Sequence, residues 1–104
     1  MKPHGVALDS QEIQDFCRRW KIKGLSVFGS ILRDDFGPES DVDFVVDYDE
    51  DADWDLFDAM SMQEELEAIL GRSADLLDRK GIESSENRFL KHAILSTQVP
   101  VYGS

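Results

Sequence analysis

The sequence predicts an α/β (α+β) fold in which helices pack on a small β-sheet, within a single domain spanning 1–104. Short apolar or alternating runs, typical of strands, recur between longer stretches that have apolar residues at helical spacing. Apolar residues make up 41% of the chain and charged residues 32%, which is ordinary for a globular protein. A chain of 104 residues is expected to fit one domain and to leave no room for a second.

Eight elements are expected along the chain. In order, they are helix 10–20, strand 25–28, a short helix 31–35, strand 41–48, helix 55–70, strand 74–77, helix 87–96 and strand 99–102. The first helix follows Asp9 and Glu12, which form a capping-box variant. Gly24 breaks the helical pattern, and the apolar run after it stops at Gly29, as a buried strand entering a tight turn does.

The strand expected over 41–48 separates two kinds of side chain. Val42, Phe44 and Val46 share one face, because side chains alternate along a strand. The opposite face carries Asp41, Asp43 and Asp47. One face is therefore expected to enter the core while the opposite face carries carboxylates.

The later elements rest on helical spacing and on residues that end a helix or a sheet. Gly71 is placed to cap the C-terminus of the second long helix, and Pro100 indicates that the last strand lies at a sheet edge. Side chains expected to point into the core from the two later helices are Ala59, Met60, Met62, Leu66, Ile69, Leu70, Leu90, Ala93 and Ile94.

The charge of the chain restricts its ligands. The formal net charge is −11, and no Lys or Arg occurs between Asp34 and Gly71. Proteins that bind nucleic acid hold its phosphates mainly with Lys and Arg, so direct nucleic-acid binding is not expected. A cation or a basic protein surface would be attracted to this chain.

The sequence also indicates a compartment. Cys17 is the single cysteine, so it has no partner for an intrachain disulfide, and it is expected to be a small core residue in a reducing compartment. No run approaches the ~20 apolar residues of a membrane helix, and the first residues do not resemble a signal peptide. A cytoplasmic protein without membrane association is expected.

The turn after the strand 25–28 is a candidate phosphate site. Gly29 would let a ligand approach the backbone, and a helix that starts at Ser30 would direct its free N–H groups towards an anion. The alternative is that Gly29-Ser30 is only a turn.

Three carboxylates are candidate metal ligands beside this turn. Asp41 and Asp43 would have Cα atoms roughly 6.5–7 Å apart on one strand face. Asp75 begins another expected strand, whose other residues are apolar. Oxygen ligands suit Mg²⁺, and a second ion about 3.5–4 Å from the first would need a third carboxylate.

Each of these features also has a purely structural interpretation. An Asp-x-Asp pair is more often a solvated strand face, and Asp75 alone could be a helix cap or a surface charge. Their order favours a joint site: a strand, Gly-Ser, a short helix, an Asp-x-Asp strand, a helix and a third Asp on a strand.

Other metal sites are disfavoured. The alternating acids over 47–53 resemble the start of a calcium-binding EF-hand loop, but its sixth position is Ala52 instead of Gly and its twelfth is Asp58 instead of Glu. His4 and His92 have no Cys or second His at a spacing that suits zinc.

One motif resembles a known family. Gly29-Ser30, ten further residues and Asp41-Val42-Asp43 are similar to the signature of the polymerase-β-like nucleotidyltransferases. The wider resemblance is to the minimal nucleotidyltransferases and continues to the end of the last expected strand. Members of that group serve as antitoxins beside HEPN-domain ribonuclease toxins.

The resemblance implies a fold and a set of roles. The fold is a small mixed sheet with helices, similar to the polymerase-β palm. Gly29 and Ser30 would hold the triphosphate of ATP. Asp41 and Asp43 would bind Mg²⁺, and Asp75 would complete the site for two ions and help to deprotonate the nucleophile.

Two positions depart from the family pattern. Ile31 stands where many relatives have Arg, and Asp34 where many have Gly. The first change removes a possible phosphate contact. Arg33 remains, and it could either touch the nucleotide or form a structural salt bridge with the acidic site.

The implied activity is transfer of AMP from ATP to a hydroxyl, in the antitoxin branch a Tyr of the cognate HEPN toxin, with release of pyrophosphate. Neutralisation of the toxin would follow. Two alternatives remain open: a non-catalytic antitoxin that acts by occlusion, and a small-molecule nucleotidyltransferase of the aminoglycoside-modifying type. The last usually needs a further domain to hold its acceptor, and the chain is expected to have no room for one.

Overall fold

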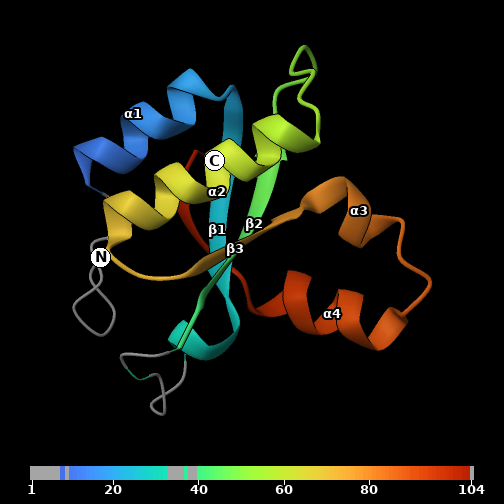
Figure 1. The fold of residues 1–104 in the computed structure, drawn as a ribbon. Helices are drawn as coiled ribbons and strands as arrows, with labels where there is room; N and C mark the ends of the chain where they lie inside the picture. Colours follow the sequence, from blue (N-terminus) through green and yellow to red (C-terminus); the bar gives the residue numbers. More distant parts are fainter. Residues whose placement is uncertain (1–7, 9, 33–36, 38–39, 104) are drawn as a thin grey trace.

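The structure, a computed structural model, describes residues 8, 10–32, 37 and 40–103. Its centre is a four-stranded sheet with strand order β3-β2-β1-β4, and helices lie on both faces (Figure 1). The elements are α1 Gln11–Arg19, β1 Ile22–Phe28, the short 3₁₀ helix η2 Gly29–Leu32, β2 Val42–Tyr48, α2 Leu56–Leu70, β3 Ala74–Asp78, α3 Arg79–Glu83, α4 Arg88–Thr97 and β4 Val99–Tyr102.

The sheet is mixed, as the resemblance implied. β1 pairs antiparallel with both β2 and β4, whereas β2 and β3 are parallel. A parallel pair needs a crossover connection, and α2 provides it. β4, which contains Pro100, is an edge strand, so the prediction from this residue is confirmed.

The larger core lies between one face of the sheet and the helices α1 and α2. Val42, Phe44 and Val46 of β2 are fully buried in it, together with Cys17 of α1. Burial raises the pKa of the Cys17 thiol to about 12, an effect that the nearby Arg18 opposes. The expected division of β2 into an apolar and an acidic face is therefore confirmed.

A smaller core lies on the opposite face of the sheet. It contains Val45 of β2, Ile82 of α3 and Ile94 of α4, with Phe28 and Leu95 packed against them. These helices cover Val45, and the acidic residues Asp43 and Asp47 lie on β2 to either side of it.

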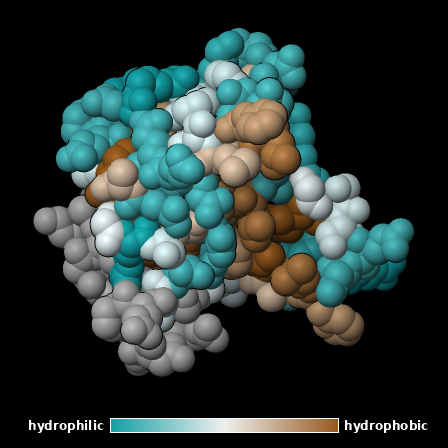
Figure 2. Space-filling model, in the orientation of Figure 1, coloured by the Kyte–Doolittle hydropathy of each residue, from teal (hydrophilic) through white to brown (hydrophobic). Residues whose placement is uncertain are grey.

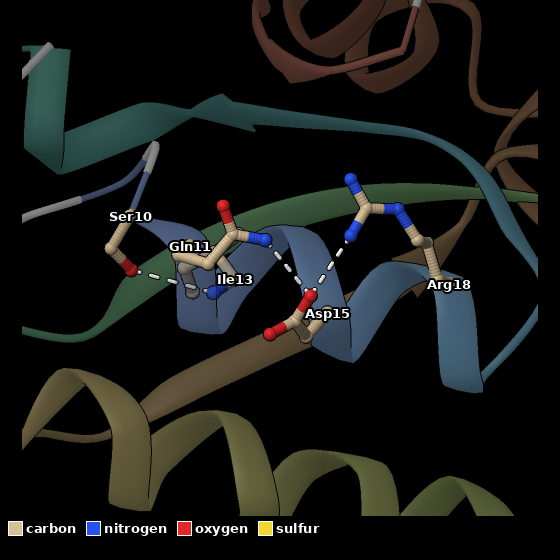
Figure 3. Close-up of polar contacts among 5 residues, drawn as sticks. All are labelled: Ser10, Gln11, Ile13, Asp15 and Arg18. Carbon is tan, nitrogen blue, oxygen red and sulfur yellow. Dashed lines mark hydrogen bonds and ion pairs between the residues drawn. The ribbon is translucent and has the colours of Figure 1, made fainter.

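Helix α1 begins one residue later than the capping pattern predicts. Ser10, and not Asp9, is its N-cap, because the Ser10 hydroxyl accepts a hydrogen bond from the N–H of Ile13 at 3.4 Å (Figure 3). Asp9 lies outside the described residues. On the exposed side, the Asp15 carboxylate accepts from both Gln11 and Arg18 at 2.9 Å.

Helix α2 has both of its expected ends. Asp55 and Asp58 form a reciprocal capping box at the N-terminus, and Gly71 caps the C-terminus with a left-handed φ of 73°. Within the described ranges, the helices are too short or too polar to cross a membrane.

Several local predictions were wrong. Gly24 does not end an element but lies inside β1, at a register irregularity where a missing side chain is tolerated. The described part of the short helix, Gly29–Leu32, is 3₁₀ and starts two residues earlier than expected, while residues 33–35 of the predicted helix lie outside the described part. Helix α3 was not expected.

Four side chains expected in the core are exposed instead. Met60 is 54% exposed and Leu90 is 52% exposed, and Ala59 and Ala93 are also at the surface. Helical spacing identifies a stripe but not its exact direction, and neighbouring Met62 and Ile94 are the residues that the sheet buries.

The core contribution of α2 can be tested with two leucines. Leu66 is fully buried and Leu56 is 73% exposed on the same helix. Leu66→Ala is expected to lower the free energy of unfolding by about 2–5 kcal/mol, because it removes buried methyl groups and leaves a cavity. Leu56→Ala should change it by less than about 0.5 kcal/mol. Urea unfolding measures both, and equal losses would contradict the described packing.

Candidate active site

A row of paired residues crosses the sheet at one end of β2. In the β1–β2 pair, Phe28 lies opposite Asp43, and in the β2–β3 pair, Asp43 lies opposite Asp75. Adjacent strands are about 4.8 Å apart, so the two carboxylates are immediate neighbours on the sheet. Asp41, just before β2, is exposed, as is Asp75, while Asp43 is half-buried. The structure thus places the three predicted carboxylates at the same end of the neighbouring strands β2 and β3.

Gly29 lies directly against one of these carboxylates. Its φ is +77°, a left-handed conformation that side chains rarely adopt, and a Cβ atom there would lie 2.8 Å from Asp43 Oδ2. That distance is shorter than van der Waals contact allows. The backbone conformation therefore favours glycine at this position, and a larger residue would require the Asp43 carboxylate to shift.

The turn after β1 places backbone groups beside the carboxylates. Ser30 lies in η2, so the expected short helix begins beside the carboxylates, although its expected continuation over 33–35 lies outside the described residues. The first N–H groups of such a turn have no partner within the turn itself. Arg33, the other predicted nucleotide contact, lies outside the described residues.

Arg72 supports the segment that leads into Asp41. Its guanidinium donates to the carbonyl of Gly37 at 2.7 Å. Ser40 closes the same turn, since its hydroxyl accepts from the N–H of Gly37 at 3.1 Å and its own N–H donates to the Gly37 carbonyl at 3.1 Å. Arg72, two residues after α2, thus holds the backbone of Gly37, which precedes β2.

Glu67 supports the start of β3 in a similar way. Its carboxylate accepts from the N–H of Ala74 at 2.9 Å, and the N–H of Val42 donates to the carbonyl of Ser73 at 3.1 Å. The sequence reasoning missed both Glu67 and Arg72. The available signal was the position of Arg72, which is the first basic residue after a long stretch without any.

The predicted metal ligands are neighbours, but they do not form a complete set of coordinating side chains. Among the residues described, no three Asp, Glu, His or Cys side chains converge as closely as metal ligands do. Mg²⁺ commonly uses only one or two protein carboxylates and completes its shell with water and substrate phosphates. The adjacent Asp43 and Asp75, with Asp41 close in sequence, offer the oxygen donors that such an ion prefers.

This arrangement defines a class of enzyme. A glycine turn at the start of a 3₁₀ helix, next to carboxylates on a mixed sheet, suits a phosphate chain and a hard cation together. Those are the requirements of enzymes that transfer nucleotidyl groups from a nucleoside triphosphate.

The chain belongs to the nucleotidyltransferase domain family, whose pattern matches residues 10–96. It is similar to the protein adenylyltransferase MntA of Thermococcus cleftensis, with 35% identity over 66 residues that cover 64% of this chain and 65% of that protein. A Methanocaldococcus jannaschii protein, provisionally named a protein adenylyltransferase, is 34% identical over 76 residues, or 73% of each chain.

Solved structures share the fold. A protein provisionally described as a minimal nucleotidyltransferase matches with a TM-score of 0.64 and 26% identity, covering 84% of this chain and 83% of that one. A chain from the complex of a tri-AMPylated Shewanella oneidensis HEPN toxin with an MNT antitoxin matches with a TM-score of 0.62 and 20% identity, covering 93% and 71%. The expected fold class is confirmed.

The contact between Gly29 and Asp43 can be tested with a matched pair of glycines. Gly29 and Gly71 have similar positive φ values of +77° and +73°, but a Cβ at Gly71 would meet nothing within 4 Å. Alanine at either site should cost about 1–2 kcal/mol of stability from backbone strain. Only Gly29→Ala should also displace Asp43 and weaken binding of Mg²⁺ with a non-hydrolysable ATP analogue. Calorimetric titration checks this, and equal affinities for the two variants would contradict it.

Proposed function

We propose that this chain is a cytoplasmic antitoxin of the minimal nucleotidyltransferase type. It transfers AMP from ATP to a hydroxyl, in our proposal of a tyrosine, on a HEPN-family ribonuclease toxin and so neutralises the toxin. The observation that carries the proposal is the pairing of Asp43 with Asp75, with Gly29 directly against Asp43, in a chain of this family. The adenylyltransferase names of two relatives, and the AMPylated toxin in the complex of a structural neighbour, support the choice of acceptor.

The reaction follows from the charges at the site. The acceptor oxygen attacks the α-phosphorus of ATP in line with the bond to the β-phosphate, that bond breaks, and pyrophosphate leaves. We assign to Asp75 the role of taking the proton of the incoming hydroxyl, and its exposure beside Asp43 supports this role. The backbone of Gly29 and Ser30 would hold the phosphates, since no side chain at Gly29 intervenes.

Asp41, Asp43 and Asp75 would hold two Mg²⁺ ions. Their donor atoms are all oxygens, which is the set that this ion prefers. When bound, Mg²⁺ neutralises phosphate charge and lowers the pKa of the attacking hydroxyl. The carboxylates would hold the ions beside the triphosphate, and the mutual repulsion of these carboxylates is offset when cations lie between them.

The acidity of the chain favours a second candidate function. With a net charge of −11, the chain complements a basic surface such as one that binds RNA. A non-catalytic antitoxin could therefore inhibit its toxin by covering that surface. The two functions differ in a single product, namely AMP attached to the partner.

The catalytic assignment can be tested with carboxylates on one strand face. In the double variant Asp41→Asn/Asp43→Asn, the site loses two negative charges while the side chains keep their size. Transfer of labelled AMP onto the HEPN partner should therefore fall to background. Asp47→Asn is the control: Asp47 lies on β2 but at its other end, 4.0 Å from Arg79. It should retain transfer.

The readout also separates the two candidate functions. Intact-mass spectrometry of the partner after co-expression should show added AMP with the wild-type chain and with Asp47→Asn, but not with the double variant. A stable, inhibited complex without added AMP would favour occlusion. Full transfer by the double variant would contradict the assignment of Asp41 and Asp43.

A further inference from the structure

Exposed apolar side chains gather on one part of the surface. Within the described residues, every large apolar side chain that is strongly exposed, apart from Leu32, belongs to α2, β3 or α4. Figure 2 shows hydrophobic residues in a continuous band across the region where these elements meet in Figure 1. The residues of this apolar band are Leu56, Phe57, Met60, Leu77, Phe89 and Leu90.

Two hollows lie along the apolar band. One, of about 380 Å³, is lined by Tyr48, Trp54 and Met60 among others. The second, of about 280 Å³, is lined by Leu77 and Leu90 together with α3. Both reach Asp78 at the end of β3, so the band offers a shaped surface and not only scattered apolar residues.

The apolar band contributes little to the core of the chain itself. Phe89 is 90% exposed and Leu56 is 73% exposed, and each lies in the first turn of its helix. Monomeric proteins rarely expose contiguous apolar patches of large size, and larger patches mark sites of protein or ligand interaction. The band therefore has the character of an interface.

The charges beside the apolar band restrict its occupant. The carboxylates Asp49, Asp55 and Asp78 line the hollow on its α2 side, and they outnumber the basic Lys80 that lines it with them. Interfaces combine an apolar centre with a polar rim of complementary charge. A matching partner would present apolar side chains to the band. It would also present Lys or Arg side chains where its surface meets the acidic α2 side. A second copy of this acidic chain would instead bring like charges together.

The apolar band is continuous with the candidate active site. Leu77 lies two residues after Asp75 on β3, and the two side chains share one face of the strand, with Cα atoms roughly 6.5–7 Å apart. A protein bound to the band would hold its own surface next to Asp75. Fixing an acceptor in this way converts transfer between two molecules into a step within one complex.

We propose that the apolar band is the docking surface for the protein that supplies the acceptor hydroxyl. The proposal rests on the proposed function, because it identifies how the acceptor protein is recognised. When the partner docks on the band, its basic surface lies against α2. The acceptor hydroxyl of the partner then lies next to Asp75. The band determines which protein is modified, and the carboxylates determine the chemistry.

Two substitutions remove apolar surface without endangering the helices. Leu56→Glu and Phe89→Glu place a carboxylate in the first turn of α2 and α4, where the helix dipole favours negative charge. Ala68→Glu is the control, since Ala68 is exposed on α2 outside the apolar band and its substitution adds the same charge. The HEPN partner, with its nuclease inactivated, is the probe.

The experiment measures the Kd of each variant for this partner by calorimetry and the elution of the mixture by gel filtration. Each band variant should weaken binding by about tenfold or more, and the Leu56→Glu/Phe89→Glu variant should not co-elute. Ala68→Glu should stay within about twofold of wild type. The band variants and Ala68→Glu should bind Mg²⁺ with the ATP analogue as wild type does. The double variant Asp41→Asn/Asp43→Asn should still bind the partner.

Each other outcome has a definite meaning. Undiminished binding by the Leu56→Glu/Phe89→Glu variant overturns the docking surface while leaving AMP transfer intact. A complex that depends on the band but yields no transfer overturns the proposed function and supports the docking surface. If the wild-type chain does not bind the partner, both are overturned. If the chain alone is a dimer that the double variant dissociates, the band is a self-association surface and the proposal is wrong.

Discussion

The register of β2 between its two neighbours is the constraint on which the candidate site depends. β2 pairs antiparallel with β1 and parallel with β3, and only in this register do Phe28, Asp43 and Asp75 form one row. A slip of one residue would turn every side chain of β2 to the opposite face. It would bury Asp43 and expose Val42 and Phe44, so the free energy of the core maintains the geometry of the site.

The two faces of β2 explain how so acidic a chain can be both stable and reactive. Its apolar face is closed by α1 and α2, whereas α3 and α4 cover only the middle of the other face, at Val45. At one end, Asp47 lies 4.0 Å from Arg79, which also donates to Gln98 at 3.0 Å. At the other end, Asp43 lies beside Gly29. The same face thus carries a structural ion pair and a site suited to cations and phosphates.

Much of this organisation could be predicted from local patterns. Alternation over 41–48 identified the two faces, and Gly71 marked the end of α2, because strand period and capping depend on nearby residues. The order of the strands could not be obtained in this way, since β3 pairs with β2 through contacts distant in sequence. For the same reason Met60 and Leu90 were wrongly assigned to the core.

The parts of the site differ in how far they were predictable. The spacing from Gly29 to Asp43 identified the family, but the support from Arg72 and Glu67 appears only when the ends of α2, β2 and β3 are brought together. The role of Arg33, the metal ligation by the three carboxylates and the single-domain organisation stay predictions.

The most direct test of this account is a crystal structure of the chain with Mg²⁺ and a non-hydrolysable ATP analogue. The account predicts metal density between Asp43 and Asp75, with the triphosphate against the backbone of Gly29. A nucleotide bound at the opposite end of β2, in the hollow beside Tyr48 and Trp54, with no ion at Asp43, would contradict it.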